Sequence, residues 1–226
     1  MQILDKRKAM AIPPLLRLGF RPFFLLGSIL AALSIPLWIL ALQGTLLVGQ
    51  PLGGWLAWHR HELVFGFAGA IIAGFLLTAV QTWTGRPGLS GKPLAVLVLI
   101  WLLARLAWWS GSPLLLLVLN LAFFGGVALV MGRLLWAVRQ TRNYPIVLVL
   151  VLLLGADLLT LLGVQQANDS WQRQGVWGAV WLVAAMMSLI GGRVIPFFTQ
   201  RGLGRVAAVQ PWVWLDWALL IVTVVV

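Results

Sequence analysis

Long apolar runs recur along the whole chain and restrict what it can fold into. A transmembrane helix needs roughly 20 mostly apolar residues, because it rises about 1.5 Å per residue and the hydrocarbon layer is about 30 Å thick. Six runs of about this length lie between polar, glycine or proline breaks, at residues 22–42, 62–80, 93–109, 114–136, 145–164 and 176–195. The sequence therefore predicts an all-α fold, a polytopic transmembrane helix bundle with six full spans.

A seventh apolar run, residues 212–226, is shorter than the others. As a helix it would be about 22 Å long at ~1.5 Å per residue, and no basic or aromatic anchor follows it. We expect this run to be a truncated seventh span. No low-complexity linker divides the chain, so we expect residues 1–226 to form a single integral membrane domain that is a fragment of a longer protein.

Composition excludes several classes of protein and of metal site. The chain is 62% hydrophobic and only 9% charged, whereas a soluble domain has about 25% charged residues, so the lipid bilayer is its expected surrounding. The absence of cysteine excludes disulfides, iron–sulfur clusters, thiolate-ligated haem and cysteine-based zinc or copper sites within this chain. The two histidines, His59 and His61, are too few for a multi-histidine metal centre made by this chain alone.

The net charge of +11 indicates orientation and not nucleic-acid binding, because the basic residues lie in short loops between apolar runs. Thirteen of them fall on one side of the predicted spans: Lys6, Arg7, Lys8, Arg17, Arg21, Arg86, Lys92, Arg133, Arg139, Arg142, Arg193, Arg201 and Arg205. The other side has Arg60 and Arg173. The positive-inside rule then predicts a cytoplasmic N-terminus. Tryptophans at the span ends, Trp108 among them, are typical of aromatic belts.

The densest polar cluster is Trp58-His59-Arg60-His61-Glu62, at the outer end of the second run. Two histidines at positions i and i+2 point about 200° apart on a helix, so they share a site only if the helix begins at Arg60 or later. Metal ligation and a plain interfacial role both remain open here. If the helix is regular from His61 onward, we expect His61 to be the inward-facing histidine and Glu62 to head a stripe of small residues that lets another helix approach.

Two further charges, Arg105 and Asp157, lie inside apolar runs, each twelve residues after an opening proline. Asn120 falls near the same depth in the fourth run. An isolated charge in the membrane costs several kcal/mol, so we expect Arg105 and Asp157 to form a buried polar pair. Such a pair is either a clamp between helices or part of a polar pocket or proton path.

Several segments, in this order, resemble the NnrS family of bacterial membrane proteins. They are GFRPFF at residues 19–24, WHRHELVFGF at 58–67, IAGFLLTAV at 72–80, WTG at 83–85 and GRVIPFFT at 192–199. The histidine-bearing segment and its glycine-rich continuation are fairly specific. The family is described as inner-membrane proteins of about twelve helices that contain haem and copper and are associated with nitric oxide and nitrosative stress.

The resemblance implies that His59 and His61 are candidate ligands of haem or copper, and that Glu62 orients an imidazole through its other nitrogen. It also implies the bacterial inner membrane as the location and nitric oxide or another small gas as a partner. The match covers roughly the N-terminal half of such a protein, so ligands from the remainder would be missing from this chain.

Three functions from different classes follow from these observations. The first is a haem- and copper-binding membrane protein of the nitric oxide response. The second is a transporter or channel in which Arg105, Asp157 and Asn120 line a polar path. The third is a structural membrane subunit whose polar groups only hold helices together. Whether the protein is an enzyme, and its oligomeric state, are left open by the sequence.

Overall fold

A computed structural model describes residues 11–46 and 49–202, together with residues 214 and 218. Its regular structure in this part of the chain is entirely helical, and six helices are long and apolar enough to cross a membrane. The elements are η1 (Pro14–Leu16), α2 (Phe20–Leu42), α3 (Gly54–His61), η2 (Glu62–Ala68), α4 (Gly69–Thr84), α5 (Lys92–Leu106), η3 (Ala107–Trp109), α6 (Pro113–Ala137), η4 (Thr141–Asn143), α7 (Tyr144–Gln165) and α8 (Asp169–Gly202). The predicted helix bundle is confirmed. The expected seventh span lies outside the described residues, apart from Trp214 and Ala218.

The second span differs most from its prediction. The elements α3, η2 and α4 follow one another without a break, so the spanning helix runs over Gly54–Thr84 and begins eight residues earlier than expected. The polar residues at 59–62 do not mark its outer end, because the bundle supplies partners for them. His61 lies seven residues from Gly54, about 10 Å along the helix axis at ~1.5 Å per residue.

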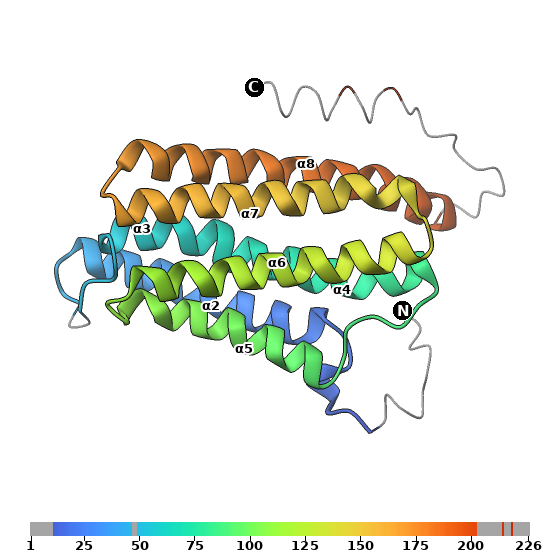
Figure 1. Ribbon diagram of the computed structural model, residues 1–226, viewed down its shortest axis with the longest axis horizontal. Coiled ribbons are helices and arrows are strands. Elements are labelled where there is room, and N and C mark those ends of the chain that lie inside the picture. Colours follow the sequence, from blue (N-terminus) through green and yellow to red (C-terminus); the bar gives the residue numbers. More distant parts are fainter. Residues whose placement is uncertain (1–10, 47–48, 203–213, 215–217, 219–226) are drawn as a thin grey trace.

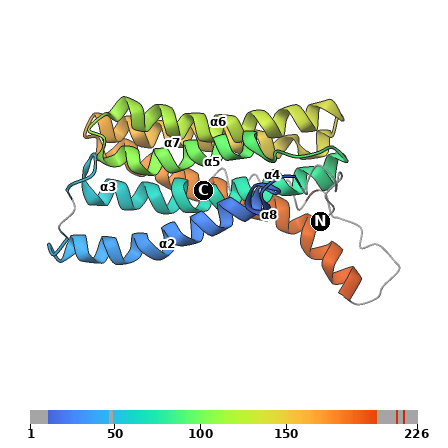
Figure 2. The same ribbon diagram turned by 90° about the horizontal axis from the view of Figure 1, so that it is seen from below.

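The helix of residues 54–84 is the most deeply buried of the six. It contacts α2 on one side and α6 on the other, while α5, α6, α7 and α8 pack in sequence order (Figure 1). Seen from below, α2 lies in a separate layer from α5 and α6, and the C-terminal part of α8 diverges from the other helices (Figure 2).

Glycines let the neighbouring helices approach the central one. A Cβ atom added at Gly69 would lie 2.8 Å from the Phe124 ring of α6, and one at Gly74 would lie 3.0 Å from the Phe23 side chain of α2. At both positions a side chain would force its neighbour to shift. In lipid, where helices associate by close packing and not by the hydrophobic effect, these glycines fix the position of the central helix.

Candidate functional site

His61, Glu62, Arg105, Asn120 and Asp157 form one buried polar network inside the bundle. They come from α3, η2, α5, α6 and α7, so a single cluster connects five elements of the fold. Arg105 is 8% exposed and the other four are fully buried. Asn120, like His61, lies seven residues after its helix begins, which places both at a similar depth.

His61 joins two carboxylates. Its Nδ1 lies 3.1 Å from Oε1 of Glu62, and its Nε2 lies 2.7 Å from Oδ1 of Asp157. A neutral imidazole carries one N–H and donates to only one of the two oxygens, whereas an imidazolium donates to both. The two contacts are both hydrogen bonds from His61 if it is an imidazolium between two carboxylates.

Glu62 is held by three different elements. Trp108 donates a hydrogen bond of 2.7 Å from Nε1 to Oε1 of Glu62, the same oxygen that faces His61. The other oxygen, Oε2, lies 3.0 Å from Nη1 of Arg105. These two atoms form an ion pair, but their geometry does not meet the angles of a hydrogen bond. Arg105 in turn donates from Nη2 to the side-chain oxygen of Asn120. The Asn120 amide donates to the Leu116 carbonyl at 2.9 Å, which completes the chain of contacts.

The network balances its own charge. With His61 as an imidazolium, it contains two cations and two anions, in contact with one another. Lone charges at this depth are costly, while paired and hydrogen-bonded ones cost far less, so the cluster can persist without access to water. The Arg105 guanidinium also lies 5.4 Å from the centre of the Trp101 ring, which adds a cation–π contact.

The expected direct pair of Arg105 and Asp157 is wrong. Both side chains are buried, but Arg105 pairs with Glu62, and Asp157 pairs with His61. Arg105 and Asp157 were expected to pair because they lie at equal depth in their helices, but depth does not determine which faces of α5 and α7 point toward each other. The early start of the second span carries His61 and Glu62 into the bundle, where they lie between the two charges and take the place of a direct contact.

The first turns after His61 are π-helical. The π-helix covers Glu62–Ala68, so the regular α-helix expected from His61 onward is not formed. π-Helical segments are rare and occur often at functional sites. A Cβ atom at Gly66, in the middle of this segment, would collide with Nη1 of Arg105 and would lie 2.9 Å from Oε2 of Glu62. The Gly66 carbonyl also accepts a 3.2 Å hydrogen bond from Nε1 of Trp101.

His59 faces away from this network. Because α3 already includes both histidines, they point in different directions, and the prediction that His61 is the inward-facing one is confirmed. The His59 ring stacks on Trp38 of α2, with ring centres 4.5 Å apart and planes 11° apart. Its Nδ1 is buried without a hydrogen-bond partner. A site shared by both histidines would require an unwound helix start, which the structure does not have.

The donor atoms can be tested against haem and copper. Within the described residues, no group of three or more histidine, aspartate or glutamate side chains is arranged to hold a metal ion. Copper sites in proteins use several such ligands, so these residues do not fit copper by themselves. Haem needs only one axial histidine. His61 does not fit this role, because both of its nitrogens contact carboxylates, whereas His59 has an unpaired nitrogen.

A comparison with protein families identifies the group to which this chain belongs. The family model described as NnrS protein matches residues 14–226. The chain belongs to the NnrS family. No curated protein and no solved structure matches it. At the family level, NnrS membership makes this a membrane protein of the nitric oxide response, and the matched range includes every residue of the buried network.

Sequence reasoning missed two tryptophans of this NnrS site. Trp108 was interpreted as a belt residue, but its side chain is fully buried and its indole N–H donates to Glu62. Trp101, in the middle of an apolar run, gives no polar signal at all, yet it contacts both Arg105 and the Gly66 carbonyl. The neighbouring Trp109, which is 39% exposed, is a surface residue.

Proposed function

We propose that this protein binds haem in the bacterial inner membrane and acts there in the response to nitric oxide, with His59 as the ligand that this chain provides. Family membership over residues 14–226 supports the biological role. The single observation that supports the ligand is the buried, unpartnered Nδ1 of His59 on a ring that stacks against Trp38. Nitric oxide is small and apolar, so it can reach such a site through the bilayer.

Of the two candidate ligands, His59 is the better supported. A nitrogen that binds iron must be free of other partners. If a ring nitrogen of His61 bound iron, it would lose its contact with Glu62 or with Asp157, and that carboxylate would be buried without its histidine partner. Leaving a buried charge unpaired costs about 3–5 kcal/mol. His59 has no such cost, since its ring nitrogens make no hydrogen bond within the described residues. Bound haem would supply an iron that coordinates nitric oxide.

The polar network then has a positioning role. His61 is two residues from His59 on α3, and its contacts with Glu62 and Asp157 tie α3 to η2 and α7. Because these contacts fix the rotation of α3 about its axis, they also fix the direction in which His59 points. We therefore propose that His61, Glu62, Asp157 and Arg105 hold the ligand helix in place. Copper, if it binds to this family member, requires ligands beyond the described residues.

A transport path along Arg105, Asp157 and Asn120 has less support. These side chains are buried and each contacts another member of the network or the backbone, so the arrangement favours a clamp between helices. None of these three residues lines the hollow on the outside of α6 or the hollow between the end of α4 and the loop after α6.

A visible spectrum of the purified chain, titrated with haemin in detergent, tests the proposal. We expect a Soret band with one haem per chain in the wild type, and loss of that band in His59→Ala. In His61→Gln we expect haem to bind to the folded fraction, because glutamine keeps one hydrogen bond to a carboxylate. A folded His59→Ala protein with an unchanged Soret band would refute the ligand assignment. Absence of any Soret band in the wild type would refute haem binding by this chain.

A further inference from the structure

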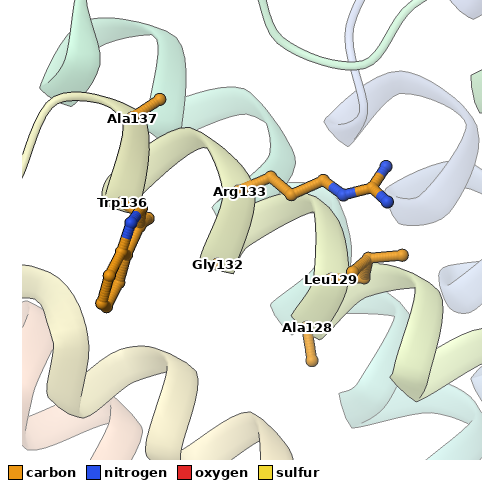
Figure 3. A pocket seen from close by; sticks show the side chains of 6 residues that line it. All are labelled: Ala128, Leu129, Gly132, Arg133, Trp136 and Ala137. Carbon is orange, nitrogen blue, oxygen red and sulfur yellow. The ribbon is translucent and has the colours of Figure 1, made fainter.

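The C-terminal end of α6 carries a groove on the outside of the bundle (Figure 3). It is lined by Ala128, Leu129, Gly132, Arg133, Trp136 and Ala137, and its volume is about 480 Å³. Ala128, Gly132 and Trp136 follow one another at intervals of four residues, so they share one face of α6. In Figure 3, the side chains of Arg133 and Trp136 extend in different directions from α6, and Gly132 between them leaves the helix surface bare.

This surface is apolar apart from one arginine. Leu129 is 53% exposed and Trp136 is 74% exposed, as expected for side chains that face lipid. Arg133 is exposed, and its guanidinium has no ion pair or hydrogen bond within the described residues. Arg133 lies one helical turn before the end of α6 at Ala137, about 6 Å at ~1.5 Å per residue, which is within reach of the membrane interface.

Within the part of the chain that the structure describes, this arginine has no counter-charge. The five acidic residues are Asp5, Glu62, Asp157, Asp169 and Asp216, so no acidic residue occurs between 63 and 156. Of these five, the three that the structure describes are paired elsewhere, with Arg105, His61, Arg60 and Arg173. Arg139 and Arg142 line a second hollow directly after α6, which adds positive charge to the same end of the helix.

We propose that this groove binds an anionic phospholipid of the leaflet at the basic end of the bundle. The phosphate contacts the Arg133 guanidinium, whose planar fork matches phosphate oxygens. One acyl chain lies along the face of Ala128 and Gly132, and the Trp136 ring, which is closer to the end of α6 than Arg133, packs beside the headgroup in the interface, where tryptophan is enriched. The positive-inside rule assigns this end to the cytoplasmic leaflet, which carries the anionic lipids.

Lipid exchange on the delipidated protein, residues 1–226, in neutral detergent tests this site. Native mass spectrometry would measure binding of phosphatidylglycerol and of phosphatidylcholine, a lipid without net charge. We expect Arg133→Gln to weaken phosphatidylglycerol binding about fivefold, since one basic residue near an anionic headgroup contributes that order of affinity. Arg86→Gln is the matched control, because it removes the same charge from another loop at the basic end. We expect the control to have little effect.

A second pair of variants tests the apolar half of the groove. A Cβ atom at Gly132 would lie 3.8 Å from the nearest side-chain atom of Val147, an ordinary contact, so Gly132→Ala is expected to fold normally. Gly132→Leu fills the groove and should weaken phosphatidylglycerol binding more than Gly132→Ala does. Equal losses in Arg133→Gln and Arg86→Gln, equal binding of the two lipids, or no effect of Gly132→Leu would each overturn the proposal.

Discussion

His61 and Asp157, 96 residues apart in the sequence, share a 2.7 Å contact at a point where neither side chain is exposed. This contact joins α3 to α7 across the bundle. Asp157 contacts Nε2 of His61, and Glu62 contacts the other ring nitrogen, Nδ1, so both nitrogens of His61 have a partner.

Removal of the Asp157 carboxylate should destabilise the protein strongly. In Asp157→Ala, Nε2 of His61 loses its partner in a buried position, and a loss of about 3–5 kcal/mol is expected for a broken buried pair. Asp157→Asn should cost less, because the amide can still form a hydrogen bond with a neutral His61. Thermal unfolding in detergent, followed by tryptophan fluorescence, measures both variants. Equal melting temperatures of Asp157→Ala and the wild type would contradict the network.

Arg105 and Glu62 should show energetic coupling. Arg105→Gln leaves Glu62 without its cationic partner, and Glu62→Gln leaves Arg105 without its anionic one, so each single change should destabilise the bundle. The double variant leaves neither charge and should cost less than the sum of the two, with a coupling of about 0.5–3 kcal/mol. Denaturation of the four proteins of this cycle gives the value. Additive losses would show that the ion pair is not important for stability.

Gly66→Ala should destabilise the protein although alanine favours helices. The added Cβ atom collides with the Arg105 guanidinium and with Glu62, and overpacking of this kind costs about 1–3 kcal/mol. Gly155→Ala in α7 is the matched control, since nothing lies within 4 Å of a Cβ atom at that position. We expect the control to melt at or slightly above the wild-type temperature. The opposite order of the two variants would argue against the packing around Gly66.

The topology can be mapped with single cysteines, because the chain contains none. We expect Asn168→Cys, between α7 and α8, to react with a membrane-impermeant maleimide from the outside of intact cells. Arg86→Cys, between α4 and α5, should react only after the cells are opened. Reaction of both residues from the same side would contradict the predicted arrangement of spans.

The apolar runs predicted the spans well because the membrane imposes a minimum length on every helix. They could not predict where the second helix begins, since the cluster from His59 to Glu62 is polar and a polar cluster in a sequence normally marks the end of a span. The bundle changes this outcome by providing Arg105, Asp157 and Trp108 as partners for those residues. Partners on distant helices have no signature in the local sequence.

The candidate site shows the same limit. Depth along a helix follows from residue counting, so the common level of Arg105, Asp157 and Asn120 could be predicted. Direction around a helix depends on its rotation in the bundle, and here also on the π-helix, which no residue pattern indicates. The expectation that His61 faces inward was nevertheless right, since α3 is regular up to that residue.

The π-helix of residues 62–68 also determines how α3, before it, is rotated about the helix axis relative to α4, after it. A π-turn accommodates an additional residue in the helix, and each residue turns an α-helix by about 100°. If all seven of these residues instead formed regular α-helix, with the glycine contacts from Gly69 to Gly74 unchanged, the additional residue would no longer be accommodated by the π-turn. The part before it would then rotate by about 100° as a unit and shift along its axis. His61 would turn away from Asp157, and His59 would leave Trp38, so the π-helical form of this short segment determines the orientation of both histidines together.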